Sequence, residues 1–183
     1  MKNINGEPGC KGRGNIAPVT INLPRIGIEA KGDIDKFFEI LKSRLILAKE
    51  SLLHRYGILK KLRVKDLPFV AGQKLIKGAE NLEEEDSIEP ILKQGTWGIG
   101  FIGLAEALTA LTGKHHGESD EARELGVRIV TFMRQYTDKF SEETNLNWSC
   151  YATPAEGLSG KFIKKDQKMF GIIKQYACYA KYL

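Results

Sequence analysis

The segments of this chain that favour β-strands lie too far apart in the sequence to pair as hairpins. One β-prone run covers residues 15–23, and a second, at residues 148–152, comes near the end of the sequence. Hairpin loops are usually about two to five residues long. Most of the sequence between the two runs has the apolar periodicity of helices. The pattern predicts a helix-rich α/β chain, and a length of 183 residues predicts a single domain.

The first β-prone run has two faces with different side chains. Pro18 removes a backbone donor from the strand, so we predict a strand that is irregular there or lies near a sheet edge. The apolar face carries Ala17, Val19, Ile21 and Leu23, and the other face carries Ile16, Pro18, Thr20 and Asn22.

Helices are predicted where apolar residues recur at three- and four-residue steps and where capping residues begin or end the pattern. Residues 67–70 are predicted to be a short extended piece, and the acidic run 83–86 to be solvated surface. The predicted helices run from the cap Asp33 to Gly57, from Ser87 to Gly95, from Ile99 to Gly113, from Ser119 or Asp120 past Phe140, and from Pro154 with a break at Gly160 or Gly171.

A short strand followed directly by a helix cap is the most informative local motif. Thr153 can cap a helix, Pro154 suits its first turn, and Glu156 completes a capping box. A helix N-terminus that follows a strand can also bind an anion, because free N–H groups and the helix dipole point the same way. By itself the motif fits either an ordinary cap or an anion site.

Composition limits the class of protein. The formal charge of +5 suits an anionic substrate or a basic patch without requiring nucleic acid. Cys10, Cys150 and Cys178 contain no CxxC pair, which favours reduced thiols over a disulfide framework or a zinc site. The first residues lack an apolar signal core, and the most apolar window, 99–111, is too short to cross a bilayer. We therefore expect a soluble cytoplasmic protein with no membrane partner.

Three further motifs have two interpretations each. Residues 98–103 match GxGxxG, but the helical segment predicted before them favours close packing of a helix start over a dinucleotide site. The side chains of His115 and His116 point in different directions because the two residues are adjacent, so a loop role is favoured over metal binding. The lysine- and tyrosine-rich tail, residues 161–183, is interpreted as a helix with a solvated basic face, and nucleic acid is not expected as a partner.

Five segments, in one order, resemble the anaerobic (class III) ribonucleoside-triphosphate reductases, and the likeness as a whole runs from about residue 5 to about residue 174. These enzymes are the glycyl-radical branch of ribonucleotide reductase. The segments are GRGNIAPVTINLPR (12–25), DSIEPIL (86–92), IGFIGLAEAL (99–108), GKHHGES (113–119) and YATPAEGL (151–158).

The resemblance implies a fold and a reaction. The fold would be part of a ten-stranded α/β barrel around a finger loop. A cysteine at the loop tip becomes a thiyl radical that removes the 3′ hydrogen of a ribonucleoside triphosphate, and the 2′ hydroxyl leaves as water. The radical is stored on a glycine. An iron–sulfur activase that uses S-adenosylmethionine generates this radical.

The resemblance also assigns site residues. Asn15 would be a polar active-site residue close to the ribose, on the descending arm of the finger loop. The substrate phosphates would bind to a turn through its backbone N–H groups, with the Thr153 hydroxyl adding a contact. The turn consists of Ala152, Thr153, Pro154, Ala155, Glu156 and Gly157. The whole chain would be one partial domain: residues 1–24 the descending arm and following strand, 25–160 barrel helices and strands, and 161–183 a divergent tail.

Several parts of the family pattern have no counterpart in these 183 residues. They are the radical cysteine, the second active-site cysteine, the radical glycine, the C-terminal zinc cysteines and the N-terminal nucleotide-sensing domain. Cys10 and Cys150 do not match the catalytic cysteines. We expect an internal reductase fragment that binds no cofactor or metal and forms no deoxynucleotide alone. The alternative is a remnant that binds nucleotide or pairs with other reductase segments, itself or the activase.

Overall fold

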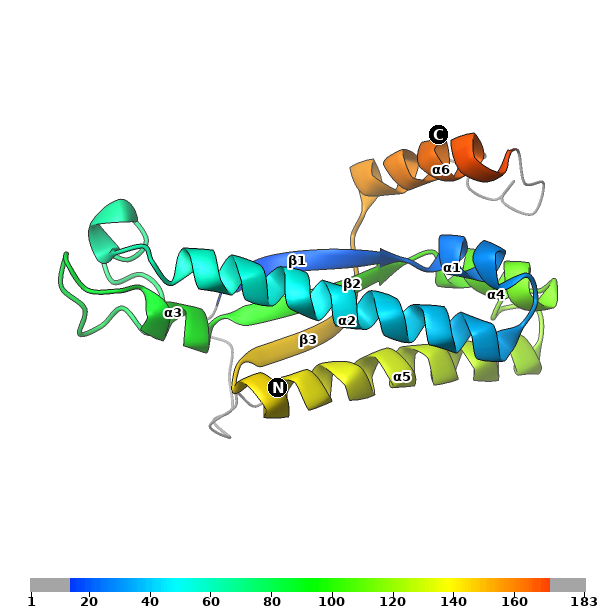
Figure 1. The fold of residues 1–183 in the computed structure, drawn as a ribbon, viewed down its shortest axis with the longest axis horizontal. Helices are drawn as coiled ribbons and strands as arrows, with labels where there is room; N and C mark the ends of the chain where they lie inside the picture. The colour runs from blue at the N-terminus through cyan, green and yellow to red at the C-terminus, as the bar shows by residue number, and fades with distance from the viewer. Residues whose placement is uncertain (1–13, 172–183) are drawn as a thin grey trace. The chain divides into compact units, whose positions relative to one another are not determined.

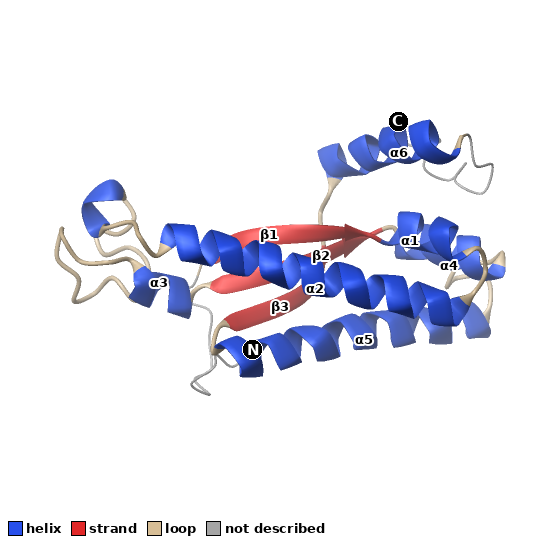
Figure 2. Ribbon diagram, in the orientation of Figure 1, coloured by secondary structure: helices blue, strands red, loops and turns tan. Residues whose placement is uncertain are grey.

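The computed structural model describes residues 14–171. Its three strands form one sheet in the order β1-β2-β3. The three arrows run in the same direction (Figure 2), so the sheet is parallel and the predicted helix-rich α/β class is confirmed. The elements are β1 (Asn15–Asn22), α1 (Leu23–Ala30), α2 (Ile34–Leu59), the 3-10 turn η1 (Val64–Asp66), α3 (Glu89–Gln94), β2 (Thr96–Ile102), α4 (Leu104–Thr112), α5 (Asp120–Thr144), β3 (Asn147–Ala152) and α6 (Glu156–Phe170).

Backbone contacts divide the chain into two compact units. Within the described residues, the first unit contains 14–19, 46–99 and 134–150, and the second contains 20–45, 100–133 and 151–171. The three strands and the two long helices α2 and α5 (Figure 1) each contribute residues to both units. Parallel neighbouring strands need a crossover connection, which is why helices separate every pair of strands in the sequence.

Aromatic side chains build the core of the first unit. Trp97 of β2 is fully buried and meets the ring of Tyr56 of α2 edge to face, with centroids 5.7 Å apart. Trp148 of β3 meets Phe140 of α5 at 5.5 Å, and its indole N–H donates to the Thr144 hydroxyl at 2.8 Å. These contacts hold the end of α2 against β2 and the end of α5 against β3.

The second unit is built on close packing of α1 against α4. Asn22 Oδ1 accepts a hydrogen bond from the Arg25 N–H at 3.3 Å and begins α1. Gly27 then faces α4: a Cβ at this position would lie 3.1 Å from the Ala107 carbonyl oxygen and 3.1 Å from Ala110 Cβ. The glycine therefore sets how near the two helices approach each other.

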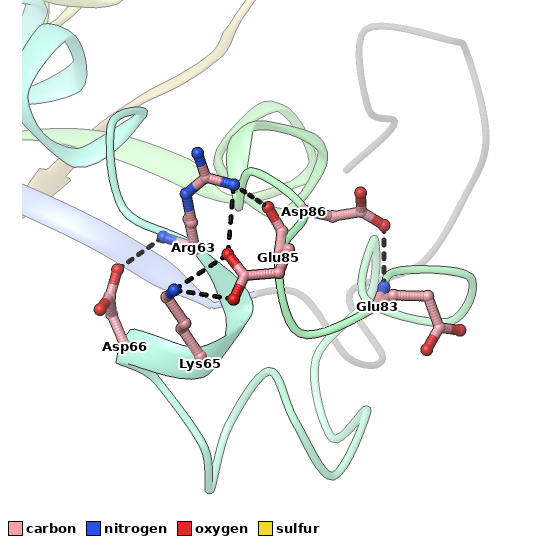
Figure 3. A network of polar contacts seen from close by, with 6 residues as sticks. All are labelled: Arg63, Lys65, Asp66, Glu83, Glu85 and Asp86. Atoms are coloured by element: carbon pink, nitrogen blue, oxygen red, sulfur yellow. Dashed lines mark hydrogen bonds and ion pairs between the residues drawn. The ribbon is translucent and has the colours of Figure 1, made fainter.

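The loop between α2 and α3, in the first unit, is organised by charged side chains (Figure 3). Glu85 accepts from Lys65 Nζ at 2.7 Å, and its backbone oxygen accepts from Arg63 at 2.5 Å. Asp66 accepts from the Arg63 N–H and Asp86 from the Glu83 N–H, both at 2.8 Å. Residues 83–86 are exposed, as predicted. Exposed pairs of this kind contribute little to stability, so the network orders the loop more than it strengthens the fold.

Most predicted element boundaries are confirmed. Pro18 lies in an edge strand of the described sheet. Asp33 and Ser119 accept hydrogen bonds from the Lys36 and Ala122 N–H groups at 3.0 and 3.2 Å, and so begin α2 and α5. Gly113 ends α4 in the left-handed conformation that favours glycine.

Other predictions of local structure are wrong. Residues 99–102 belong to β2 and not to a helix. The prediction failed because a strand buried on both faces has a continuous apolar sequence, and apolar periodicity cannot distinguish such a sequence from a buried helix. Residues 67–70 form turns, and Gly57 lies inside α2 instead of ending it. The short helix α1 was not predicted, because its eight residues include a proline and a glycine.

Two glycine substitutions should have opposite effects on stability. Gly57→Ala adds a methyl group where nothing lies within 4 Å, inside a helix, and should raise the free energy of unfolding by about 0.5–1 kcal/mol. Gly27→Val should lower it by about 1–3 kcal/mol, because α4 backbone atoms occupy the space. Urea denaturation followed by circular dichroism measures both. Equal effects of the two substitutions would contradict the packing described.

Candidate functional site

The turn between β3 and α6 is shaped by the sheet. The Thr153 N–H donates to the Phe101 carbonyl of β2 at 3.0 Å, so the chain still follows the middle strand at this residue. α6 begins at Glu156 with Ala155 as its N-cap, and the Ser159 N–H donates to the Ala155 carbonyl at 2.9 Å. The predicted helix start at Pro154 and the capping box led by Thr153 are therefore wrong, because Thr153 is held by the sheet.

The Thr153 side chain has a different partner. Its hydroxyl oxygen lies 3.1 Å from that of Thr20 of β1. Gly100 of β2 lies between them: a Cβ there would collide with Thr153 Oγ1 and lie 3.4 Å from Thr20 Oγ1. The two hydroxyls share one hydrogen bond, which leaves the pair able to make further hydrogen bonds.

The first turn of α6 is open. None of the side chains described caps this helix. The first N–H groups of a helix have no partner within the helix, and its dipole favours an anion there. Gly157 is exposed, and no atom lies within 4 Å of a Cβ added to it. The turn can therefore bind an anionic group through backbone donors, with Thr153 beside it.

The predicted site residues lie in different units. Asn15 is the exposed first residue of β1 in the first unit, whereas residues 152–157 lie in the second. The β1 side chain that contacts the turn is Thr20, which the sequence analysis did not identify. Its signal was weak: a threonine on the more polar face of a β-prone run is common.

Other candidate residues have structural roles. Burial raises the pKa of the half-buried Cys150 thiol to about 11, which keeps it protonated at neutral pH, as expected of a small core thiol. His115 Nδ1 accepts from the Gly117 N–H at 3.0 Å, and Glu118 accepts from the His115 N–H at 2.9 Å. This confirms the loop role of His115 just before α5.

Within residues 14–171, no three His, Cys, Asp or Glu side chains are arranged so that they could hold a metal ion. No helix in that part of the chain is long and apolar enough to cross a membrane. Cys10, Cys178 and the end of the lysine-rich tail lie outside the described residues.

The family model for anaerobic ribonucleoside-triphosphate reductase matches residues 2–182. The chain belongs to this family. The enzyme of that name from Escherichia coli is 36% identical over 177 residues, and the enzyme of enterobacteria phage T4 is 30% identical over 179 residues. These matches cover 94% of this chain but only 24% and 28% of the relatives, so the chain spans about a quarter of their length.

The fold agrees with the family assignment. The anaerobic ribonucleotide reductase of Thermotoga maritima, solved with citrate in its active site, superimposes with a TM-score of 0.70 at 21% identity. The match covers 90% of this chain and 28% of that one. The α/β chain therefore matches one part of the reductase fold, as the resemblance implied.

Gly100→Ala should destabilise this reductase segment by about 1–3 kcal/mol, because the new methyl group collides with the Thr153 hydroxyl. Thr153→Ala removes that oxygen, so the double variant should recover at least about 0.5 kcal/mol of the loss. Thr20→Ala should recover none, because Thr20 Oγ1 lies at an ordinary contact distance of 3.4 Å. Urea denaturation of the single and double variants measures the coupling. Additive effects for Gly100 and Thr153 would contradict the arrangement.

Proposed function

We propose that this chain forms part of the substrate-binding wall of an anaerobic ribonucleoside-triphosphate reductase. In this proposal the turn 152–157 binds the substrate triphosphate. The observation that carries it is the open N-terminus of α6, which follows directly after a strand of the parallel sheet. Ligands of open α/β sheets bind outside the carboxyl ends of the strands, where this turn lies. In support, the Thermotoga maritima enzyme was solved in complex with dATP and CTP.

The chemistry assigned to this segment is positioning. Backbone N–H groups at the start of α6 would hold phosphate oxygens, and the hydroxyl pair of Thr20 and Thr153 would donate a further hydrogen bond. Asn15 would contact the ribose, as the family pattern implies. The radical cysteine and radical glycine of the family have no counterpart in this sequence, so hydrogen abstraction would depend on other reductase segments. The cytoplasm is the proposed location of this reaction.

Binding of inorganic tripolyphosphate and ATP, measured by titration calorimetry, tests the proposal. Gly157→Asp places a negative charge where the phosphate would lie. The helix itself should tolerate this change, because a negative side chain near a helix N-terminus interacts favourably with the helix dipole. The substitution should weaken binding at least about tenfold, since like charges repel at this distance. Gly157→Asn has nearly the same volume without the charge and should keep the wild-type affinity.

Gly57→Asp is the matched control, because it adds the same charge at another open glycine in a different helix. It should leave the affinity unchanged. A wild-type chain that binds neither ligand, or a Gly157→Asp variant that binds as tightly as wild type, would overturn the proposal.

A second role, pairing with other reductase segments, is favoured by exposed apolar side chains in the first unit. Phe69 is 65% exposed and Leu75 is 56% exposed, and both lie in the loop between α2 and α3. Large apolar side chains of this kind often mark an interaction surface.

An activity assay tests where the radical chemistry lies, and sedimentation tests the pairing role. With the activase, a ribonucleoside triphosphate and formate or a thiol reductant, the chain alone should form no deoxynucleotide. The remaining segments of the Escherichia coli relative should bind it in sedimentation experiments, and Phe69→Ser with Leu75→Ser should weaken this binding. Turnover by the chain alone would contradict the assignment of the radical chemistry to other segments. Unchanged binding of the double variant would exclude this loop as the pairing surface.

A further inference from the structure

Asp166 of α6 makes side-chain contacts to two residues that are distant in the sequence, Asn22 and Arg25. Its Oδ1 accepts from Arg25 Nε at 2.7 Å and from Arg25 Nη2 at 2.5 Å. Its Oδ2 accepts from Asn22 Nδ2 at 2.8 Å. Both carboxylate oxygens are therefore used, and all three residues lie in the second unit. We call these three residues the Asp166 cluster.

Asn22 joins three elements through one side chain. It is the last residue of β1, its Oδ1 accepts from the Arg25 N–H at the start of α1, and its Nδ2 donates to Asp166 of α6. Because the amide uses its oxygen for one element and its nitrogen for another, the strand end and both helices are held in one geometry.

The Asp166 cluster differs from an ordinary surface ion pair. The Asp166 side chain is 13% exposed and that of Arg25 27%, and the pair joins residues 141 positions apart. In the same unit, the Arg123–Asp120 pair lies within one helix and is 65% and 86% exposed. Asp166 is also the one acidic residue between 157 and 170, a segment that contains Lys161, Lys164, Lys165 and Lys168.

α6 is thus held at two separate places. At its start, Thr153 is bonded to Phe101 and Thr20. Asp166 lies ten residues after Glu156, which in a helix corresponds to about 15 Å. One attachment would leave a helix free to swing about that point, whereas two attachments at this separation fix the direction of its axis.

We propose that the Asp166 cluster is a positioning device that aims the N–H groups of the α6 N-terminus at an anionic phosphate group. The inference rests on the proposed function of the turn 152–157. Asp166 acts through the direction of the helix and touches no substrate, so it is a positioning residue.

Amide hydrogen exchange and tripolyphosphate titration of the full chain test the proposal together. Asp166→Asn removes the charge that the Arg25 guanidinium requires and keeps the side-chain size. Exchange of the amides in 158–170 should become at least about tenfold faster, while α2 and α5 keep their protection. Affinity for tripolyphosphate should fall at least about fivefold. Asp120→Asn makes the same change in the exposed pair and should alter neither measurement.

The outcomes are distinguishable. Unchanged exchange in α6 of Asp166→Asn would overturn the inference, as would faster exchange throughout the unit, which would indicate a general role in stability. Faster exchange confined to α6 with unchanged affinity would overturn the positioning role. If the wild type binds no tripolyphosphate, the proposed function fails, and the exchange pattern still reports whether the cluster fixes α6.

Discussion

Thr153 can lie over the middle strand of the sheet only because Gly100 has no side chain. The Thr153 N–H continues the pairing of β3 with β2, and its hydroxyl reaches Thr20 across the position that a Cβ would fill. This contact determines where the chain leaves the sheet. The start of α6 is therefore set by strand pairing and not by a capping side chain, and its first turn stays open.

An open helix start and a capped one have different uses. A side chain that accepts from the first N–H groups stabilises a helix by about 1 kcal/mol, but it occupies the donors that an anion would need. α2 and α5, whose starts are capped by Asp33 and Ser119, show the stabilised form. α6 lacks such a cap and is held instead by the Thr153 contacts and by Asp166. The helix that the proposed function needs is thus supported by contacts that do not use its first N–H groups.

Membership of the anaerobic ribonucleoside-triphosphate reductase family gives this geometry a context. The chain spans about a quarter of the Escherichia coli and phage T4 relatives, and the superposition on the Thermotoga maritima enzyme covers a similar share. In the proposed function, this segment contributes one wall of a larger fold. Positioning by hydrogen bonds suits such a wall, since it requires donors at fixed places and no titratable catalyst. The protonated Cys150 thiol agrees with that role.

The sequence by itself determined the family, the helix-rich α/β class, several helix ends and the position of the turn after β3. These features depend on local signals, such as the Asp33 and Ser119 caps and the glycine after α4, or on long runs of matching residues. Only the tertiary structure decided that 99–102 is a strand, that Thr153 pairs with Thr20, and that Asp166 binds Arg25 and Asn22. The physical reason is distance along the chain. The Thr153–Thr20 and Asp166 contacts join residues more than a hundred positions apart, and residues 99–102 are a strand because they pair with strands that are also remote in the sequence. Neither periodicity nor capping rules describe such pairs.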